Sequence, residues 1–322
     1  MSIGTPIAIY YEHPDWFRPL FDELSRRGIP HQKLHAGRVR IDPQQRPPYS
    51  FVFNRMSPSA WKRQLGDAIH FTSSLLHYLE TAGVDVFNGS RAWMVETSKS
   101  SQLSLLAGLG APAPRTRAVH SLEQLLIASG DLVFPLITKP NIGGSGAGIR
   151  KYETPEELAA AIESGAIDRG LDGVLLVQEF HRPRSGVITR IETLNGSFLY
   201  GIRLHLGEGA GFDLCPADIC QTVGGEAISS AACPAGSQKA GIRVERFDPP
   251  APIVRTVERI VRTAGIDVGG VEYLESERDG GIYFYDINAL SNFVADPVSV
   301  IGFDPTARLV DALAARLARR AA

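Results

Sequence analysis

The stretch from Gly270 to Asn288, GVEYLESERDGGIYFYDIN, carries most of the information about the fold. Two runs rich in aliphatic and aromatic residues flank a polar turn around Asp279-Gly280, which is typical of an antiparallel hairpin. Counting from the turn places Glu272 opposite Asp286 or its neighbour. Because side chains alternate between the two faces of a strand, four residues of the second run are predicted to share one face: Ile282, Phe284, Asp286 and Asn288.

Glu272, Asp286 and Asn288 would then converge on one side of the hairpin. Two carboxylates and an amide carbonyl are hard oxygen donors, and they suit Mg²⁺, which takes a few protein oxygens and shares its other positions with phosphates and water. An exposed polar face is the alternative interpretation, and it is the commoner one for a random sheet edge. Phe284, which lies between polar residues on the apolar side, favours a site.

A second hairpin is predicted around Asn195-Gly196, a strong turn signal. Counting back from this turn places Arg190 opposite Gly201, so that Arg190 and Arg203 would share a face. Two guanidinium groups on one face repel each other unless an anion joins them, and arginine is well suited to bind phosphate or carboxylate. A solvated surface, on which Glu192 neutralises one arginine, explains the pattern equally well.

The rest of the chain shows an α/β (α+β) organisation in three parts. Residues 1–89 alternate strand and helix patterns and predict a Rossmann-like α/β domain. Residues 90–180 form a central part, in which capping boxes at Ser121 and Thr154 predict two helices. Residues 181–322 contain both hairpins, and residues 207–250, rich in Gly, Ala and Ser, predict a long inserted loop.

A glycine-rich segment, Gly143 to Gly148, follows an apolar strand that carries Lys139 near its end. Glycines can adopt positive φ angles and bring backbone N–H groups close to an anion. Lys99, at the start of a predicted helix, is a second cation in an ordered position. Each of these features is weak alone, because glycine clusters usually form turns and lysines are usually solvated.

Composition excludes several classes of function. The 322 residues contain 33 Lys plus Arg and 35 Asp plus Glu, and no basic block indicates binding to nucleic acid or to an anionic membrane. No stretch approaches the length of a membrane span, so we expect a cytoplasmic protein. Three cysteines, Cys215, Cys220 and Cys233, predict neither a disulfide framework nor a zinc site.

The common nucleotide and zinc motifs are also missing, because the sequence has no Walker A segment, complete GxGxxG, HExxH or CxxC pair. Ser59 and Lys62 form an SxxK, but the companion elements of a serine nucleophile are absent, so we expect this segment on a helix surface.

Taken together, the ordered segments resemble the ATP-grasp superfamily, and within it the RimK-like carboxylate-amine ligases. The resemblance covers nearly the whole chain except residues 207–250, and it is carried by NRMSPSAWKR (Asn54 to Arg63), NGSRAWMVETSKSSQLSLLAGLGAPAPRT (Asn88 to Thr116), FPLITKPNIGGSGAG (Phe134 to Gly148), VLLVQEF (Val174 to Phe180), GVEYLE (Gly270 to Glu275) and FYDIN (Phe284 to Asn288). It implies an ATP-grasp fold, in which two α+β subdomains follow the N-terminal domain and clamp ATP.

Carried over position by position, the resemblance implies a role for each candidate residue. Lys99 and Lys139 would contact ATP phosphates beneath the glycine loop, which includes Gly143, Gly144, Ser145 and Gly146. The backbone of Gln178, Glu179 and Phe180 would meet adenine. Arg190 and Arg203 would steady the transferring phosphate and acyl oxygens. Glu272, Asp286 and Asn288 would hold Mg²⁺, with Mn²⁺ as an alternative.

Two positions depart from the family pattern. The family usually has Asp at the first metal position and Glu at the second, whereas this chain has Glu272 and Asp286, a reversal that keeps the charge. The usual acidic residue two positions before the first arginine is replaced by Ile188, which puts contacts with ribose or substrate at that position in doubt.

The implied activity is an ADP-forming ligase that joins a carboxylate to an amine through an acyl phosphate. The amine substrate would be an amino acid, a peptide or a protein terminus, without nucleic acid or membrane, and a homo-oligomer is compatible with this role. The alternatives are a non-catalytic nucleotide-binding regulatory protein and an ATP-grasp enzyme with a non-amine acceptor. We further expect Asp213 to Gln221 to form part of the substrate-side wall.

Overall fold

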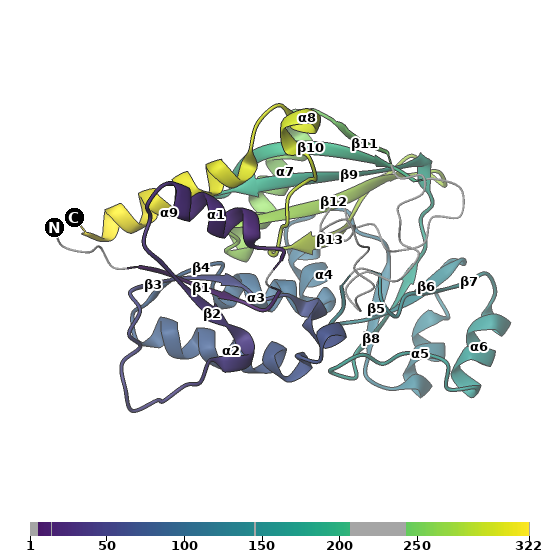
Figure 1. Cartoon of the computed structure of the whole chain (residues 1–322). Helices are drawn as coiled ribbons and strands as arrows, with labels where there is room; N and C mark the ends of the chain where they lie inside the picture. The colour runs from purple at the N-terminus through teal and green to yellow at the C-terminus, as the bar shows by residue number, and fades with distance from the viewer. Residues whose placement is uncertain (1–5, 14, 145, 207–242, 322) are drawn as a thin grey trace, which may run out of the picture.

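The computed structural model describes residues 6–13, 15–144, 146–206 and 243–321, which form three β-sheets with helices packed around them (Figure 1). Each sheet comes from one continuous part of the sequence. The α+β class predicted from the sequence is confirmed.

The N-terminal sheet is parallel, with strand order β2-β1-β3-β4. Its strands are β1 (Ile7–Tyr11), β2 (His31–His35), β3 (Phe51–Arg55) and β4 (Asp85–Phe87). Alternate residues of the central strands pack on opposite faces, with Ile7 and Ile9 toward α1 (Arg18–Arg26), and Ala8 and Tyr10 toward α2 (Gly66–Thr81). Burial on both faces explains the nearly continuous apolar runs.

The strand β2 is absent from the predictions above, because its sequence HQKLH buries only Leu34. It is an edge strand, so its sequence lacks the apolar run that marks a central parallel strand. Two short 3₁₀ helices, η1 (Ala36–Arg38) and η2 (Pro58–Arg63), follow β2 and β3.

The central sheet is antiparallel, with order β5-β8-β6-β7. It consists of β5 (Thr116–Val119), β6 (Leu136–Pro140), β7 (Arg150–Tyr152) and β8 (Leu175–Glu179), and α5 (Leu122–Ser129) and α6 (Pro155–Glu163) pack on it. The Ser121 and Thr154 hydroxyls accept from the amides of Gln124 and Glu157, each at 3.3 Å, which confirms both predicted helix starts.

The C-terminal sheet is antiparallel, with order β11-β10-β9-β12-β13. Its strands are β9 (Pro183–Leu194), β10 (Ser197–His205), β11 (Arg243–Arg246), β12 (Val268–Ser276) and β13 (Ile282–Asn288). One face packs against α3 (Ser90–Glu96), α4 (Lys99–Gly108) and the amphipathic helix α7 (Ala251–Ala264). Both predicted hairpins are present, but β11 shows that residues 207–250 are not one uninterrupted loop.

Two β-bulges change the predicted registers. In β10 the register shifts between Phe198 and Tyr200, so Arg190 pairs with Ile202, while Arg203 pairs with Thr189. The prediction that Arg190 and Arg203 share a face is therefore wrong, because adjacent cross-strand pairs point to opposite faces.

The second bulge lies in β13, where Glu272 pairs with Asp286 but Tyr273 pairs with Phe284. The extra residue, Tyr285, reverses the alternation of side chains. Phe284 consequently packs under α7, and it does not share a face with Asp286 as predicted. The bulge leaves the predicted opposition of Glu272 and Asp286 intact.

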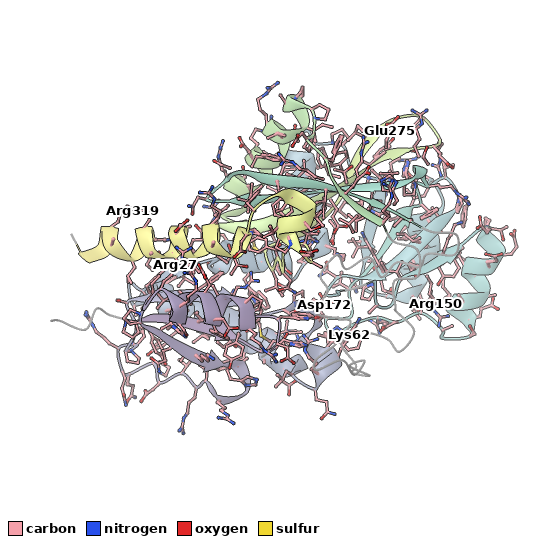
Figure 2. All side chains as sticks on the ribbon, turned by 45° about the horizontal axis from the view of Figure 1, so that its top comes forward. Arg27, Lys62, Arg150, Asp172, Glu275 and Arg319 are labelled. Atoms are coloured by element: carbon pink, nitrogen blue, oxygen red, sulfur yellow. The ribbon has the colours of Figure 1, made fainter. Side chains whose placement is uncertain are left out.

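The C-terminal helix packs against the N-terminal part of the chain. After α8 (Pro297–Ile301), helix α9 (Pro305–Ala321) packs along α1 beside the N-terminal sheet (Figure 1). Arg316 ion-pairs with Asp85 and Asp267, each at 2.6 Å, and so links the first and third sheets. Figure 2 shows Arg27 on α1 beside α9, where it ion-pairs with Asp311 at 2.5 Å. No helix within the described part of the chain is long and apolar enough to span a membrane.

Candidate active site

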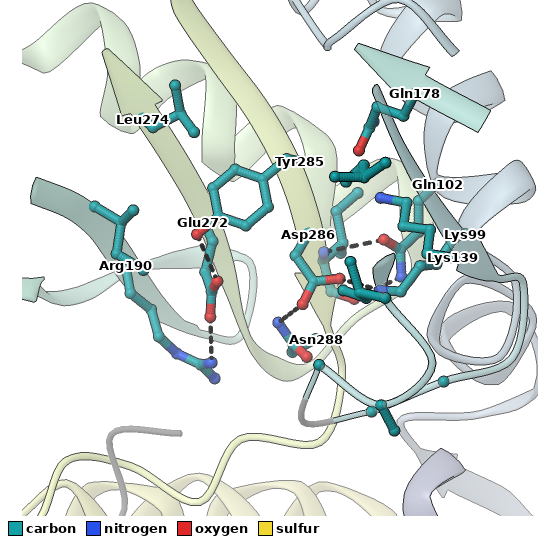
Figure 3. A pocket seen from close by; sticks show the side chains of 18 of the residues that line it. Lys99, Gln102, Lys139, Gln178, Arg190, Glu272, Leu274, Tyr285, Asp286 and Asn288 are labelled. Carbon is teal, nitrogen blue, oxygen red and sulfur yellow. Dashed lines mark hydrogen bonds and ion pairs between the residues drawn. The ribbon is translucent and has the colours of Figure 1, made fainter. Parts of the chain in front are cut away.

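A cavity of about 740 Å³ lies where the three sheets meet. The central sheet contributes Lys139 and Gln178, the C-terminal sheet contributes Arg190, Glu272 and Asp286, and the N-terminal part contributes residues around η2. Figure 3 shows these charged side chains of the central and C-terminal sheets gathered around one space. The site is thus assembled from segments more than a hundred residues apart in sequence.

The β12–β13 hairpin presents the predicted oxygen donors to this cavity. Glu272 and Asp286 are cross-strand partners, and Asn288 lies two residues further on β13. The Asn288 amide donates to Asp286 Oδ2 at 3.1 Å, and Tyr285 Oη donates to Glu272 Oε2 at 2.9 Å. Burial raises the pKa of Glu272 despite Arg190 beside it. These contacts hold both carboxylates in fixed orientations.

Lys99 is the counter-ion of Asp286. It is the first residue of α4, and its Nζ lies 2.5 Å from Asp286 Oδ1. Burial alone would lower the pKa of Lys99, but Asp286 outweighs burial and raises it. Burial likewise would raise the pKa of Asp286, and Lys99 holds it below its ordinary value. Both groups are therefore charged near neutral pH.

Lys139 is a cation without such a counter-ion. It lies on β6 and is 5% exposed, and its side chain makes no hydrogen bond or ion pair with the described residues. Burial, with Lys99 as the second cause, lowers its pKa to about 7. An anion that enters the cavity would stabilise the protonated form of this buried amine.

Arg190 lies between two carboxylates. Its Nε donates to Glu192 at 2.6 Å, and its Nη1 donates to Glu272 at 2.9 Å. These neighbours raise its pKa further even though burial opposes the charge. Arg203, in contrast, lies on the opposite face of the sheet over the Phe247 ring and does not line the cavity.

The segment Gln178 to Phe180, predicted to meet adenine and called the hinge below, lines one end of the cavity, but two of its backbone N–H groups are already occupied. The backbone N–H of Glu179 donates to the carbonyl oxygen of Arg115 at 2.9 Å, and the backbone N–H of Phe180 donates to the carbonyl oxygen of Pro135 at 2.8 Å. The Glu179 carboxylate is buried and bonded to Arg115, Arg278 and the amide of Val133. The hinge is therefore rigid, and neither of these N–H groups is available to a ligand.

Gly143, Gly144 and Gly146 of the glycine-rich segment also line the cavity, while Ser145 lies outside the described residues. Gly146 has a φ angle of +66°, which a side chain would strain. A Cβ on Gly144 would stand 3.1 Å from Ser59 Cβ, so the segment packs closely against η2. The Ser59 side chain is buried there, which corrects the prediction of a helix surface for the SxxK segment.

Sequence reasoning missed several other groups at the site. Glu96 at the end of α3 accepts from the amides of Ala289 and Leu290, and burial raises its pKa to about 7. The Gln102 side-chain amide donates to the carbonyl oxygen of Ile287 and accepts from its backbone N–H, so it holds β13 in place. Only the sequence position of Glu96, three residues before Lys99, could have indicated it.

The donor set fits a divalent cation of the Mg²⁺ type. Two carboxylates and one amide carbonyl from adjacent strands face the cavity, and each is oriented by a neighbour, as ligands in metal sites usually are. Within the described residues no group of three or more His, Cys, Asp or Glu side chains could hold a metal. Phosphate oxygens and water would have to complete the coordination.

Comparison with known proteins adds an independent observation. No protein-family model matches the chain. The carbamoyl phosphate synthase large chain of Methanothrix thermoacetophila is 30% identical over 154 residues, which are 44% of this chain and 14% of that protein. The D-alanine–D-alanine ligase of Pseudomonas entomophila is 38% identical over 76 residues, 23% of each chain. The matches therefore span less than a quarter of these relatives.

Solved structures match over almost the whole length. D-alanyl-alanine synthetase A of Vibrio cholerae has a TM-score of 0.69 at 15% identity and covers 99% of this chain and all of its own. The ATP-grasp ligase PsnB, complexed with a minimal precursor, has a TM-score of 0.65 at 20% identity, with 97% and 99% covered. A RimK domain ATP-grasp protein of Sphaerobacter thermophilus also has a TM-score of 0.65, at 18% identity, with 95% and 98% covered. The chain therefore has the ATP-grasp fold, the fold that these proteins share.

Proposed function

We propose that this protein is an ATP-dependent, ADP-forming ligase that joins a carboxylate to an amine. The observation that carries the proposal is the cavity itself, in which Lys99 of α4, Lys139 of the central sheet, and an arginine and three oxygen donors of the C-terminal sheet surround one space. Phosphoryl transfer depends mainly on positioning and on neutralising charge, and this set of side chains supplies both.

Each group has a part in the proposed reaction. Lys99 and Lys139 bind phosphate oxygens, while Glu272, Asp286 and Asn288 hold the metal ion. When bound, the ion supplies further positive charge beside the transferring phosphate. Arg190 neutralises charge on the attacking carboxylate and the transferred phosphoryl group. A carboxylate oxygen attacks the γ-phosphorus, ADP leaves, and an acyl phosphate forms. The amine nitrogen then attacks the acyl carbon, phosphate leaves, and loss of a proton from nitrogen gives the amide.

The adenine end of the cavity is assigned to the hinge. Because the N–H groups of Glu179 and Phe180 are occupied, we propose that adenine is recognised by backbone carbonyls of the hinge and by the N–H of His181. The Gln178 amide donates to Thr116 at 2.8 Å, so its side chain fixes the hinge. The apolar neighbours Ile137 and Leu274 offer surfaces for the purine ring.

The opposite end of the cavity is assigned to the acceptors. Trp16, Ser57, Ser59 and Phe293 line it, which makes it largely apolar with two hydroxyl groups. PsnB is described in complexes with a precursor peptide, whereas the D-alanine ligases are named for a free amino acid. We therefore propose an amino acid or a peptide as the amine substrate. The predicted wall segment Asp213 to Gln221 lies outside the described residues.

The experiment that tests this function follows oxygen from the carboxylate. The protein is incubated with MgATP, amine candidates and an ¹⁸O-labelled carboxylate pool, and ADP, AMP and phosphate are analysed. We expect unlabelled ADP together with phosphate that carries one ¹⁸O atom. The label reaches phosphate because the carboxylate oxygen becomes the oxygen that bridges carbon and phosphorus in the acyl phosphate. Release of AMP would contradict the proposal.

The same experiment separates the alternatives. ATP binding without ADP formation under any condition would indicate a non-catalytic nucleotide-binding protein. Labelled phosphate that appears only with hydroxyl acceptors would indicate an enzyme with a non-amine acceptor. No binding of MgATP would overturn the assignment of the cavity.

Lys139 gives a pH prediction. Its pKa is about 7 in the free protein, so it is mostly neutral at pH 8 and must gain a proton to pair with phosphate. We expect uptake of about one proton with MgATP at pH 8, and an affinity that falls as the pH rises from 7 to 9. Calorimetry in two buffers of different ionisation enthalpy measures this proton. Identical heats in both buffers would show that Lys139 does not change protonation.

A further inference from the structure

Glu192 on β9 is a buried carboxylate to which the proposed function assigns no part. It is 1% exposed and receives the Arg190 Nε at 2.6 Å through Oε1. Its second oxygen, Oε2, is buried without a hydrogen-bond partner among the described residues. Arg190 is therefore the one hydrogen-bond partner of the Glu192 side chain among the described residues, and Glu192 can act on the cavity through Arg190.

The neighbouring strand is shaped around this ion pair. Gly270 on β12 is the cross-strand partner of Glu192. A Cβ at Gly270 would stand 2.9 Å from Glu192 Oε1 and 3.0 Å from both Nε and Nη2 of Arg190. The first distance is shorter than real Cβ contacts and the other two are tighter than most, so a side chain at position 270 would force the ion pair to shift.

The two carboxylates compete for one guanidinium group. Glu192 takes Nε and Glu272 takes Nη1. Without Glu192, Arg190 could turn to form a two-pronged pair with Glu272, the geometry that arginine prefers with a carboxylate. Such a pair would use two guanidinium N–H groups on Glu272 and leave fewer of them for a phosphate.

We infer that Glu192, with the space left by Gly270, is a positioning residue that holds the free edge of Arg190 toward the terminal phosphate of the nucleotide. This inference rests on the proposed function. The inference deepens the proposed function, because it assigns the γ-phosphate to the β9 side of the cavity, beside Arg190 and Glu272.

The test compares nucleotides with and without a terminal phosphate. Affinities for Mg²⁺ with the non-hydrolysable analogue AMPPNP and for Mg²⁺ with ADP are measured by calorimetry, together with the melting temperature. For Glu192→Leu we expect the AMPPNP affinity to fall about tenfold while the ADP affinity stays within about twofold, since one charge-assisted contact is lost. The melting temperature, measured in parallel, gives the stability that the buried Glu192–Arg190 ion pair contributes.

Two further variants make the test specific. Glu192→Gln keeps an acceptor for Arg190 Nε and should restore most of the AMPPNP affinity. Gly270→Ala keeps both charged residues but crowds them, so it should reproduce the Glu192→Leu pattern. Gly108→Ala, where a Cβ meets nothing within 4 Å, is the matched control and should change neither affinity.

The outcomes separate the inference from the function on which it rests. A wild-type protein that binds neither nucleotide would overturn the proposed function and the inference with it. A wild-type protein that binds both, with Glu192→Leu losing both affinities equally or neither, would overturn the inference alone. A fall in melting temperature without a selective loss of AMPPNP affinity would assign Glu192 to the stability of the fold and overturn the inference.

Discussion

Asp286→Asn is expected to lower turnover by about a hundredfold or more, because even residues that merely orient metal ligands typically contribute tenfold to a hundredfold. Asp286 contacts Lys99 at 2.5 Å and accepts from Asn288 at 3.1 Å, so its charge organises both the lysine and the proposed metal ion. The substitution is nearly isosteric, and we expect the fold to persist. Steady-state ADP release and the circular dichroism spectrum measure the two effects.

A matched control lies on the same hairpin. Glu275 on β12 has a side chain that is 43% exposed, pairs with Arg184 and does not line the cavity. Glu275→Gln should leave turnover unchanged, since surface ion pairs contribute about 0 to 1 kcal/mol to stability. Wild-type turnover in Asp286→Asn would show that the carboxylate does not hold a catalytic metal ion.

Lys139→Met is expected to weaken MgATP binding by about tenfold or more while making the protein more stable. The lost affinity follows from removing a buried cation that faces the phosphates, since a hydrogen bond to a charged group contributes about 1.5 to 3 kcal/mol. The gained stability follows from burial, which lowers the pKa of Lys139 to about 7. Methionine fills a similar volume without a charge.

The sign of this stability effect depends on pH. Between about pH 7 and the ordinary lysine pKa of 10.5, the unfolded chain binds more protons at Lys139 than the folded chain does. The destabilising effect of the charge is therefore complete below pH 7 and fades as the pH rises toward 10.5. The melting temperature of Lys139→Met should exceed that of wild type most at pH 6 and least near pH 10.

An exposed lysine provides the comparison. Lys33 on β2 is exposed, lies over the Phe21 ring and does not line the cavity. Lys33→Met should bind MgATP as wild type does. If Lys139→Met were less stable than wild type at pH 6, Lys139 would have a stabilising partner in solution, and its assignment as an unpaired phosphate-binding cation would be wrong.

Periodicity and turn chemistry predicted most elements correctly. The hairpin turns at Asn195-Gly196 and Asp279-Gly280 and the helix starts after Ser121 and Thr154 are where the sequence places them. These features depend on residues within a few positions of one another, so a single sequence contains the information. Helices α7 and α9 escaped prediction, although α7 is strongly amphipathic.

The composition of the candidate site was also accessible from sequence. Lys99, Lys139, Arg190, Glu272, Asp286 and Asn288 all line the cavity. Their assigned roles stay predictions that the experiments above address. Arg203 was placed wrongly because one bulged residue in β10 is enough to turn a side chain to the other face.

By itself, the sequence determined the local elements and the set of charged residues available to the site, because both follow from residue type and short-range spacing. Only the tertiary structure decided which charges meet. The bulge at Tyr285 depends on how β12 and β13 pack. Ser59 is buried because the glycine-rich segment, which follows a strand of another sheet, packs against it. Glu192 and Arg190 pair beside Gly270, which has no side chain to displace them. Such contacts join distant segments, and their geometry is fixed only when the whole core has packed.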